Sequence, residues 1–331
     1  MPALDTLWYT RCPVPTATGI AAARGRLTAE FAPDGISVRS LQDAGPDVPR
    51  EQHFTHALPG LIREGGNVPA LWARAGGEPT RLIGLTWFEE RQAILVRAGA
   101  PVRTPADLRG RRIAVPRHDI AIDFWRAMSL AGFHGALHAA GLRLTDVTLV
   151  DVVAEPDGDQ WAAELEALRD GRVDAVYVKG ALAVEAAARH GVEVGVDLDA
   201  LSDPALRVNN GTPRPVTVHQ RLLDEHPDIV VRFLAVLVEA ADWAAGHQPE
   251  VAAILAAETG AGASGVAAAY RDAHDADLHL SLSPERLDLL ARQEHFLREQ
   301  GFLARPVDVE RWAAPELLTA ARTSRRTTTT V

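Results

Sequence analysis

Residues 4–41, LDTLWYTRCPVPTATGIAAARGRLTAEFAPDGISVRSL, contain a strand-like run, a helix-like run and a second strand-like run in succession. The three runs cover Leu4–Thr10, Thr16–Leu27 and Gly35–Leu41. A strand, a helix and a strand in this order predict two parallel strands joined by a right-handed crossover. The start of the chain therefore favours an α/β fold.

The same alternation continues along most of the chain. Strand patterns fall at 80–86, 92–97, 111–115, 147–153, 175–178, 193–197 and 215–219, and helix patterns at 68–75, 122–141, 159–170, 181–190, 227–246, 249–258 and 284–301. We expect two lobes, each a parallel-rich sheet flanked by helices. Lobe 1 comprises residues 1–96 and 203–331, lobe 2 is the inserted unit 97–202, and a ligand cleft lies between them.

Composition limits the classes of partner. The chain has 331 residues, 47% of them hydrophobic, with 34 Lys and Arg against 44 Asp and Glu, a formal net charge of -10. This charge argues against nucleic acid or an anionic membrane as a partner, so an anionic ligand needs a local basic site. No signal-like start and no apolar run of about 18 residues is seen. We expect a cytoplasmic protein.

Cys12 is the only cysteine. A lone thiol forms no internal disulfide, and a free cysteine is usually an inert buried residue. However, Pro13 and Pro15 fix a rigid turn directly after the first strand and before the first helix. Free amide groups at a helix start favour anions and thiolates. This location favours a chemical role over a packing role.

Residues 49–71, PREQHFTHALPGLIREGGNVPAL, form the second informative segment. The segment has no regular helix or strand period before Val68. An arginine can bind an oxyanion through its guanidinium fork, and neighbouring glycine amides can add an anion nest. Arg63 with Gly65 and Gly66 fits that pattern, and His53 can orient the thiol or act as its base. Each residue alone is equally compatible with an ordinary structural role.

Four segments in order along the chain carry a family resemblance. YTRCPVPTA (9–17), HFTHALPGLIREGGNVPAL (53–71), LIGLTWFEERQAILVR (82–97) and RWAAPELL (311–318) resemble the 2'-hydroxybiphenyl-2-sulfinate desulfinase family of the NMT1/THI5-like superfamily. The resemblance implies a type II periplasmic-binding-protein fold. It also implies hydrolysis of the carbon–sulfur bond of an organic sulfinate, with release of sulfite and without a cofactor or metal.

The resemblance also implies site residues. By it, Cys12 is the essential cysteine, His53 the active-site histidine, Arg63 the sulfinate-binding arginine, and Gly66 the glycine whose amide contacts the sulfinate. Phe54 and Trp125 also match the family pattern. Apart from the resemblance, we expect Thr10 and Gly65 to bind substrate, and Trp87 is as compatible with lining the cleft as with packing in the core. Two mechanisms stay open, since the thiolate can attack sulfur or the thiol can protonate carbon. We expect a monomer that binds a small anionic substrate.

The sequence departs from the family at His56, Ala57 and Leu58, and it is shorter between Val115 and the DFWRA motif. The anion site is therefore better supported than a biphenyl-shaped pocket. Two rival classes remain, a solute-binding protein for sulfonate-like anions and another lyase or decarboxylase on the same fold.

Two weaker patterns suggest metal binding. His134 and His138 lie one helical turn apart, but no third ligand is evident. Residues 272–279 lack the glycine and the terminal glutamate of a calcium loop, so we expect a polar connection there.

Overall fold

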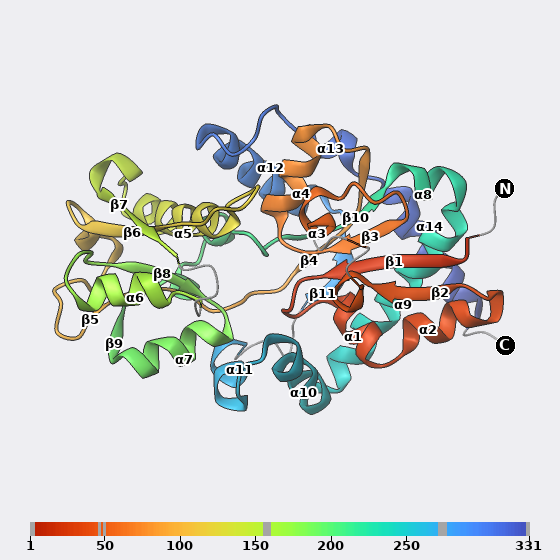
Figure 1. Cartoon of the computed structure of the whole chain (residues 1–331), viewed down its shortest axis with the longest axis horizontal. Helices are drawn as coiled ribbons and strands as arrows, with labels where there is room; N and C mark the ends of the chain where they lie inside the picture. The colour runs from red at the N-terminus through yellow and green to blue at the C-terminus, as the bar shows by residue number, and fades with distance from the viewer. Residues whose placement is uncertain (1–3, 46–47, 49–50, 155–159, 271–276, 329–331) are drawn as a thin grey trace. The chain divides into compact units, whose positions relative to one another are not determined.

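The computed structural model describes residues 4–45, 48, 51–154, 160–270 and 277–328. The chain divides into two compact units (Figure 1). Unit 1 comprises Met1–Phe88, Gly211–Glu258 and Ala273–Val331, and unit 2 comprises Glu89–Asn210 and Thr259–Asp272. The sequence boundaries placed all of 203–331 in lobe 1. In the structure, residues 89–96, which were also expected in lobe 1, belong to unit 2, as do residues 203–210 and 259–272. Helix α11 (Ala263–Ala269) packs there on helix α7 (Ala181–His190).

The centre of unit 1 is a six-stranded sheet of order β11-β4-β10-β3-β1-β2. The strands are β1 (Thr6–Arg11), β2 (Ser37–Ser40), β3 (Leu61–Glu64), β4 (Thr80–Trp87), β10 (Arg214–His219) and β11 (Asp277–Ser281). β1 pairs in parallel with β2 and β3, whereas β10 pairs antiparallel with both β3 and β4, and β11 is antiparallel to β4. The sheet is thus mixed rather than parallel-rich, because the chain returns from unit 2 as β10 and inserts between β3 and β4.

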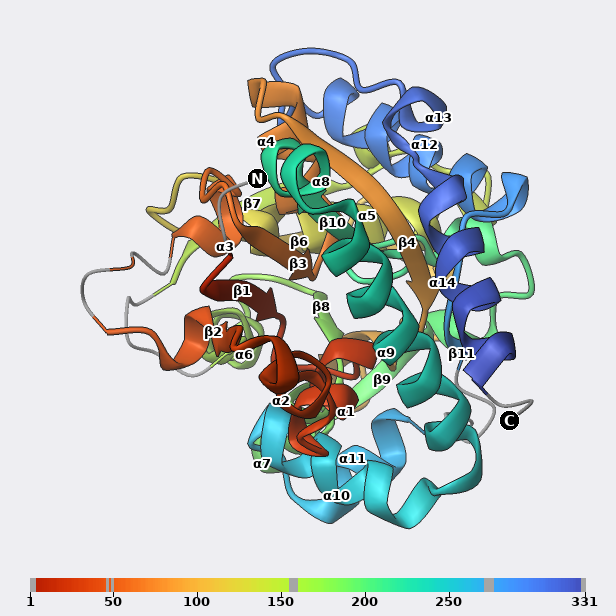
Figure 2. The same cartoon turned by 90° about the vertical axis from the view of Figure 1, so that its right-hand side faces the viewer.

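Unit 1 also contains α-helices. They are α1 (Ala17–Ala23), α2 (Arg26–Phe31), α3 (Gln52–Thr55), α4 (Asn67–Gly76), α8 (Gln220–Glu225), α9 (Pro227–Gly246), α10 (Gln248–Thr259), α12 (Pro284–Glu299), α13 (Val309–Trp312) and α14 (Pro315–Thr328). The long helix α9 packs against α1 and α14 (Figure 2). Its buried residues Ile229, Phe233, Val236, Leu237 and Ala240 follow the helical spacing seen in the sequence.

Three local predictions for unit 1 were wrong. The helix expected at 16–27 breaks at Gly25, which has a φ of 67° and separates α1 from α2. Strand β3 was not predicted, because all four of its residues are buried and two of them are charged, which hides the usual alternation. The polar connection expected at 272–279 becomes β11 from Asp277 onward, and residues 272–276 lie outside the described part of the chain.

Unit 2 contains smaller sheets. Its strands are β5 (Gln92–Arg97), β6 (Arg112–Arg117), β7 (Thr148–Val153), β8 (Val176–Lys179) and β9 (Val192–Asp197), and its other helices are α5 (Phe124–Ala139) and α6 (Ala162–Arg169). β5 pairs antiparallel with β8 and β9, and β6 pairs in parallel with β7. A parallel bridge from Ile113 to Ala175 joins β6 to the segment before β8. The expected α/β unit is present, again with mixed pairing.

Candidate active site

Cys12 and Gly65 directly follow two neighbouring parallel strands. β1 ends at Arg11 and β3 ends at Glu64, and these two residues are paired in the sheet register. The Cys12 amide continues the pairing by donating to the Glu64 carbonyl, with an N···O distance of 3.1 Å. Parallel neighbours end at the same edge of a sheet, so the sheet itself brings the thiol beside the Gly65-Gly66 pair.

The thiol has two polar neighbours. The Gly66 amide donates to Cys12 Sγ at 3.4 Å. The Nε2 atom of His53 lies 3.7 Å from the same sulfur. Cys12 is only partly buried. This arrangement gives the sulfur one hydrogen-bond donor and one group that can exchange a proton with it.

His53 is oriented by contacts on both sides. Its Nδ1 lies 2.8 Å from Thr10 Oγ1, and its carbonyl accepts a hydrogen bond from Arg63 Nε at 2.7 Å. Burial lowers the pKa of His53 well below the ordinary 6.5, and the positive charge of Arg63 lowers it further. The imidazole is therefore neutral at pH 7, and its Nε2 can accept the thiol proton when Nδ1 carries the ring hydrogen.

Arg63 is fully buried next to this pair. Its Nη2 donates to the Gly66 carbonyl at 3.1 Å, while Nη1 has no hydrogen-bond partner among the described residues. Burial lowers the pKa of Arg63 to about 10, although the neighbouring Cys12 opposes the shift. The guanidinium therefore stays charged at pH 7. A buried cation with an unused donor is a suitable partner for an oxyanion.

Gly65 has no side chain, which leaves room for Arg63 and Cys12 next to it. A Cβ atom at this position would lie 2.8 Å from Arg63 Nη2 and 3.1 Å from Cys12 Sγ. Contacts of 2.8 Å from a carbon are too short, so the guanidinium or the thiol would have to move. The absence of a side chain at Gly65 therefore lets the cation and the sulfur approach each other.

Three buried residues near the site were missed in the sequence. His56 is buried in a left-handed conformation with a φ of 57°, and burial lowers its pKa to about 3, with a further contribution from Arg63. Glu64 and Arg214 are also buried. The departure from the family pattern at His56 was a usable signal. Glu64 and Arg214 gave none, because their burial depends on the pairing of β3 with β10.

The aromatic residues expected to bind substrate do not all lie close to Cys12. Phe54 packs edge-to-face on His53, with ring centroids 5.2 Å apart. Trp87 ends β4, which β10 separates from β3, so the sheet does not place it beside Cys12.

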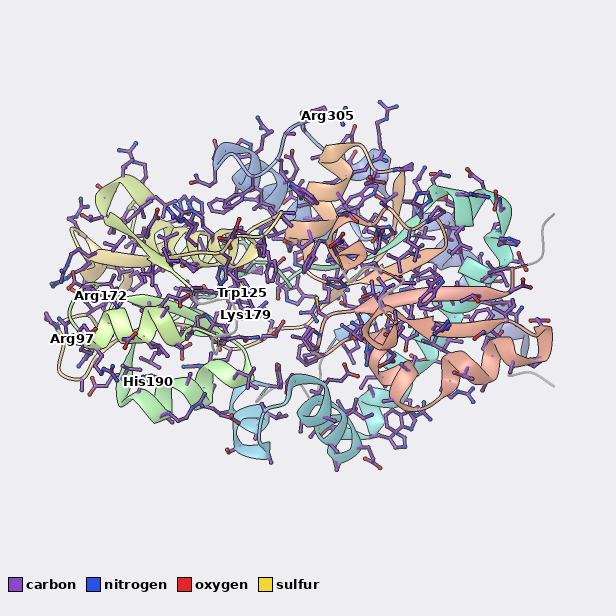
Figure 3. All side chains as sticks on the ribbon, viewed as in Figure 1. Arg97, Trp125, Arg172, Lys179, His190 and Arg305 are labelled. Carbon is purple, nitrogen blue, oxygen red and sulfur yellow. The ribbon has the colours of Figure 1, made fainter. Side chains whose placement is uncertain are left out.

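Trp125 belongs to unit 2 and is the second residue of α5. Its ring packs on Trp161 at 5.7 Å and lines a pocket of about 740 Å³ within that unit (Figure 3 labels Trp125, Arg172 and His190, which line this pocket). The structure thus assigns Trp125 to a pocket of its own unit.

Within the described part of the chain, no group of three or more His, Cys, Asp or Glu residues could hold a metal ion. His134 and His138 stack on α5 with ring centroids 5.9 Å apart, and the described residues supply no third ligand beside them. Among the described helices, none alone is long and apolar enough to cross a membrane. One bent pair, Gln248–Thr259 with Ala263–Ala269, meets that test by length and composition.

A thiol, a neutral histidine and a buried arginine at one edge of a mixed sheet define an α/β protein with a thiol-containing site suited to an anion. The chain belongs to the NMT1/THI5-like family, whose model matches residues 31–252. It is 31% identical to the 2'-hydroxybiphenyl-2-sulfinate desulfinase of Rhodococcus erythropolis, over 95% of this chain and 93% of the relative. This confirms the resemblance found in the sequence.

Solved structures extend the comparison. A mutant of the enzyme DSZB in complex with biphenyl-2-sulfinic acid is 28% identical, with a TM-score of 0.75 over 97% of this chain and 100% of that chain. The periplasmic aliphatic sulphonate-binding protein SsuA from Escherichia coli is 20% identical, with a TM-score of 0.72 over 94% and 92% of the two chains. These similarities confirm the periplasmic-binding-protein-like α/β fold.

Proposed function

We propose that this protein is a desulfinase that cleaves the carbon–sulfur bond of an aryl or other organic sulfinate and releases sulfite. The observation that carries the proposal is the buried Nη1 of Arg63, which has no partner among the described residues and belongs to the guanidinium beside Cys12 and Gly66. A sulfinate oxygen can accept a hydrogen bond from this donor. The sulfur atom of the bound sulfinate then lies near the Cys12 thiol. Similarity to a desulfinase over 95% of the chain supports the same reaction.

In this proposal each residue has a stated role. Arg63 binds the sulfinate oxygens. The Gly66 amide, which the resemblance assigns to the sulfinate, donates to Cys12 Sγ in this structure and so positions the thiol. His53 exchanges a proton with the thiol, and Thr10 fixes the orientation of the imidazole ring. Burial lowers the pKa of His53, so the ring is neutral at pH 7 and its Nε2 is available to the thiol, but the same shift makes the ring a weaker base than an exposed histidine.

Two reaction routes can release sulfite from the sulfinate with the residues of this site. In the first, Cys12 gives its proton to His53 and the thiolate attacks sulfur. The carbon–sulfur bond breaks, the carbon takes the proton from His53, and water hydrolyses the Cys–S–SO2(-) adduct to thiol and bisulfite. In the second, the thiol protonates the carbon that bears sulfur, and SO2 leaves. Water adds to SO2 to form bisulfite, and the released proton returns to the thiolate through His53.

Sulfite release from biphenyl-2-sulfinate, benzenesulfinate and methanesulfinate tests the proposal. We expect the wild-type protein to release sulfite from at least one aryl sulfinate, and Cys12→Ser to bind the same sulfinate without releasing sulfite. A gain in mass equal to SO2 on the Cys12 peptide during turnover would select the first route. Wild-type protein that binds aryl sulfinates but never forms sulfite would refute the enzymatic proposal.

A binding protein for sulfonate-like anions is the second candidate, and the shared fold with SsuA favours it. It predicts tight binding of sulfonates, with no bond cleavage. Calorimetric titration with biphenyl-2-sulfonate and octanesulfonate, alongside the sulfite assay, separates the two functions. A cytoplasmic location, a monomeric state and independence from cofactors stay predictions.

A further inference from the structure

The thiol turn, residues 12–16, joins β1 to α1 and carries Cys12 at its start. Two of its five residues, Pro13 and Pro15, have no amide hydrogen, so the turn has few ways to hydrogen-bond to the rest of unit 1. The conformation of the turn must therefore be held mainly by contacts at its two ends. At the α1 end, Thr16 Oγ1 accepts from the Gly19 amide and caps the helix.

A single residue contacts both ends of the thiol turn. The carbonyl of Glu64 accepts from the Cys12 amide at 3.1 Å. Its carboxylate accepts from the amides of Ala17 at 3.3 Å and Thr18 at 2.8 Å, the first two residues of α1. The main chain of Glu64 thus holds the start of the turn, and its side chain holds the end.

The environment of Glu64 shows that this contact is built into the fold. The residue is 1% exposed on β3, and removing a carboxylate from water costs free energy unless hydrogen bonds replace the lost hydration. Burial raises the pKa of Glu64, and the hydrogen bonds from Thr18 and Ala17 together with the positive charge of Arg214 oppose this shift. Thr86 Oγ1 also donates to Oε1 at 3.4 Å. Arg214 also donates from Nη1 to the Pro15 carbonyl, inside the thiol turn. The same buried group of charges therefore contacts the turn at its start, middle and end.

We propose that Glu64 is a positioning residue that holds the Cys12 sulfur against Arg63 and the Gly66 amide. Glu64 touches neither the sulfur nor the expected place of the substrate. Loss of its carboxylate releases the amides of Ala17 and Thr18, and the turn then shifts relative to β3. A displacement of about 1 Å of a reacting group can reduce a rate about 100-fold. This role rests on the proposed desulfinase function for its kinetic consequences only.

Glu64→Gln tests the role, because glutamine keeps the size of the side chain but directs an amide group at one of the two main-chain donors. We expect kcat for sulfite release to fall at least about tenfold while KM changes less than about threefold. Glu64→Asp restores a carboxylate on a shorter stem, and we expect a kcat between those of wild type and Glu64→Gln. The Asp variant also provides the comparison if the Gln variant fails to fold.

Alkylation of the thiol gives a readout that needs no sulfinate chemistry. Cys12 is the only cysteine, so the rates with anionic iodoacetate and neutral iodoacetamide both report on this sulfur. The ratio of the two rates cancels changes in thiolate fraction and general exposure. It keeps the attraction of the anion by Arg63. Removal of the Glu64 charge would by itself raise this ratio, so a fall in the ratio reports that the sulfur has moved away from Arg63. We expect Glu64→Gln to lower the iodoacetate to iodoacetamide ratio at least about fivefold.

Glu294→Gln is the matched control. Glu294 is also a buried glutamate of unit 1, and it accepts from the Val307 amide at 3.1 Å, but it lies on α12. We expect this variant to lose stability while keeping the wild-type alkylation ratio and kcat. A Glu64→Gln variant with wild-type ratio and wild-type kcat would overturn the positioning role. Wild-type protein that releases no sulfite would refute the proposed function, and the alkylation ratios would still test Glu64.

Discussion

His56 should make this protein sensitive to mild acid. Its side chain is 1% exposed, and burial together with the charge of Arg63 lowers its pKa to about 3, against about 6.5 in an unfolded chain. Neither ring nitrogen meets hydrogen-bond geometry with the described residues, although the main chain of Thr217 lies close enough to oppose the shift. Protonation in the folded state would leave a buried, poorly satisfied cation next to a guanidinium.

The direction and magnitude of this pH effect on the free energy of unfolding follow from proton linkage. The unfolded state takes up a proton at His56 below about pH 6.5, while the folded state does not until about pH 3, so stability falls as the pH falls through this window. At about pH 5 the unfolded histidine lies about 1.5 units below its pKa. Each unit is worth about 1.4 kcal/mol, so this single residue should remove about 2 kcal/mol of stability relative to about pH 7.5.

Urea unfolding followed by tryptophan fluorescence at about pH 7.5 and about pH 5 measures this loss. His56→Asn removes the titrating group, and asparagine tolerates the left-handed conformation at this position. The loss between the two pH values should be about 2 kcal/mol smaller in His56→Asn than in wild type. His138→Asn, on the exposed face of α5, controls for the loss of any histidine. Equal losses in wild type and His56→Asn would show that His56 does not cause the acid sensitivity.

Three substitutions in the site give further predictions. Gly65→Ala should lower kcat/KM for sulfite release at least about tenfold through its clash with the guanidinium. Gly60→Ala, where nothing lies within 4 Å of the added Cβ, should leave the rate unchanged. Arg63→Lys should lower kcat/KM about 100-fold, or about 2.7 kcal/mol, because a single ammonium cannot replace both main-chain contacts and the free donor. Thr10→Val removes the hydroxyl beside His53 Nδ1 and should lower kcat about tenfold with little change in KM, as steady-state sulfite kinetics will show.

Much of the architecture could be predicted because it depends on short-range patterns. The apolar spacing of α9 and the strand, helix and strand order of the first residues are local properties of the chain, and the structure contains these elements. The position of Cys12 between a strand and a helix is local in the same sense. Pairing partners are not local, since a strand pattern does not state which strand lies beside it. The insertion of β10 between β3 and β4 was therefore missed.

The residue types that could form a site in unit 1 are visible in the chain: a lone thiol in a proline-fixed turn, and a histidine, an arginine and two glycines in one irregular segment. The fold then places Arg63 and Glu64 in a buried strand paired with β1, which brings the thiol and the glycines to one sheet edge. The burial that keeps His53 neutral and holds Glu64 under the thiol turn is also a tertiary property. Desolvation and parallel pairing arise because segments about 50 residues apart come together, and no local sequence pattern predicts such contacts.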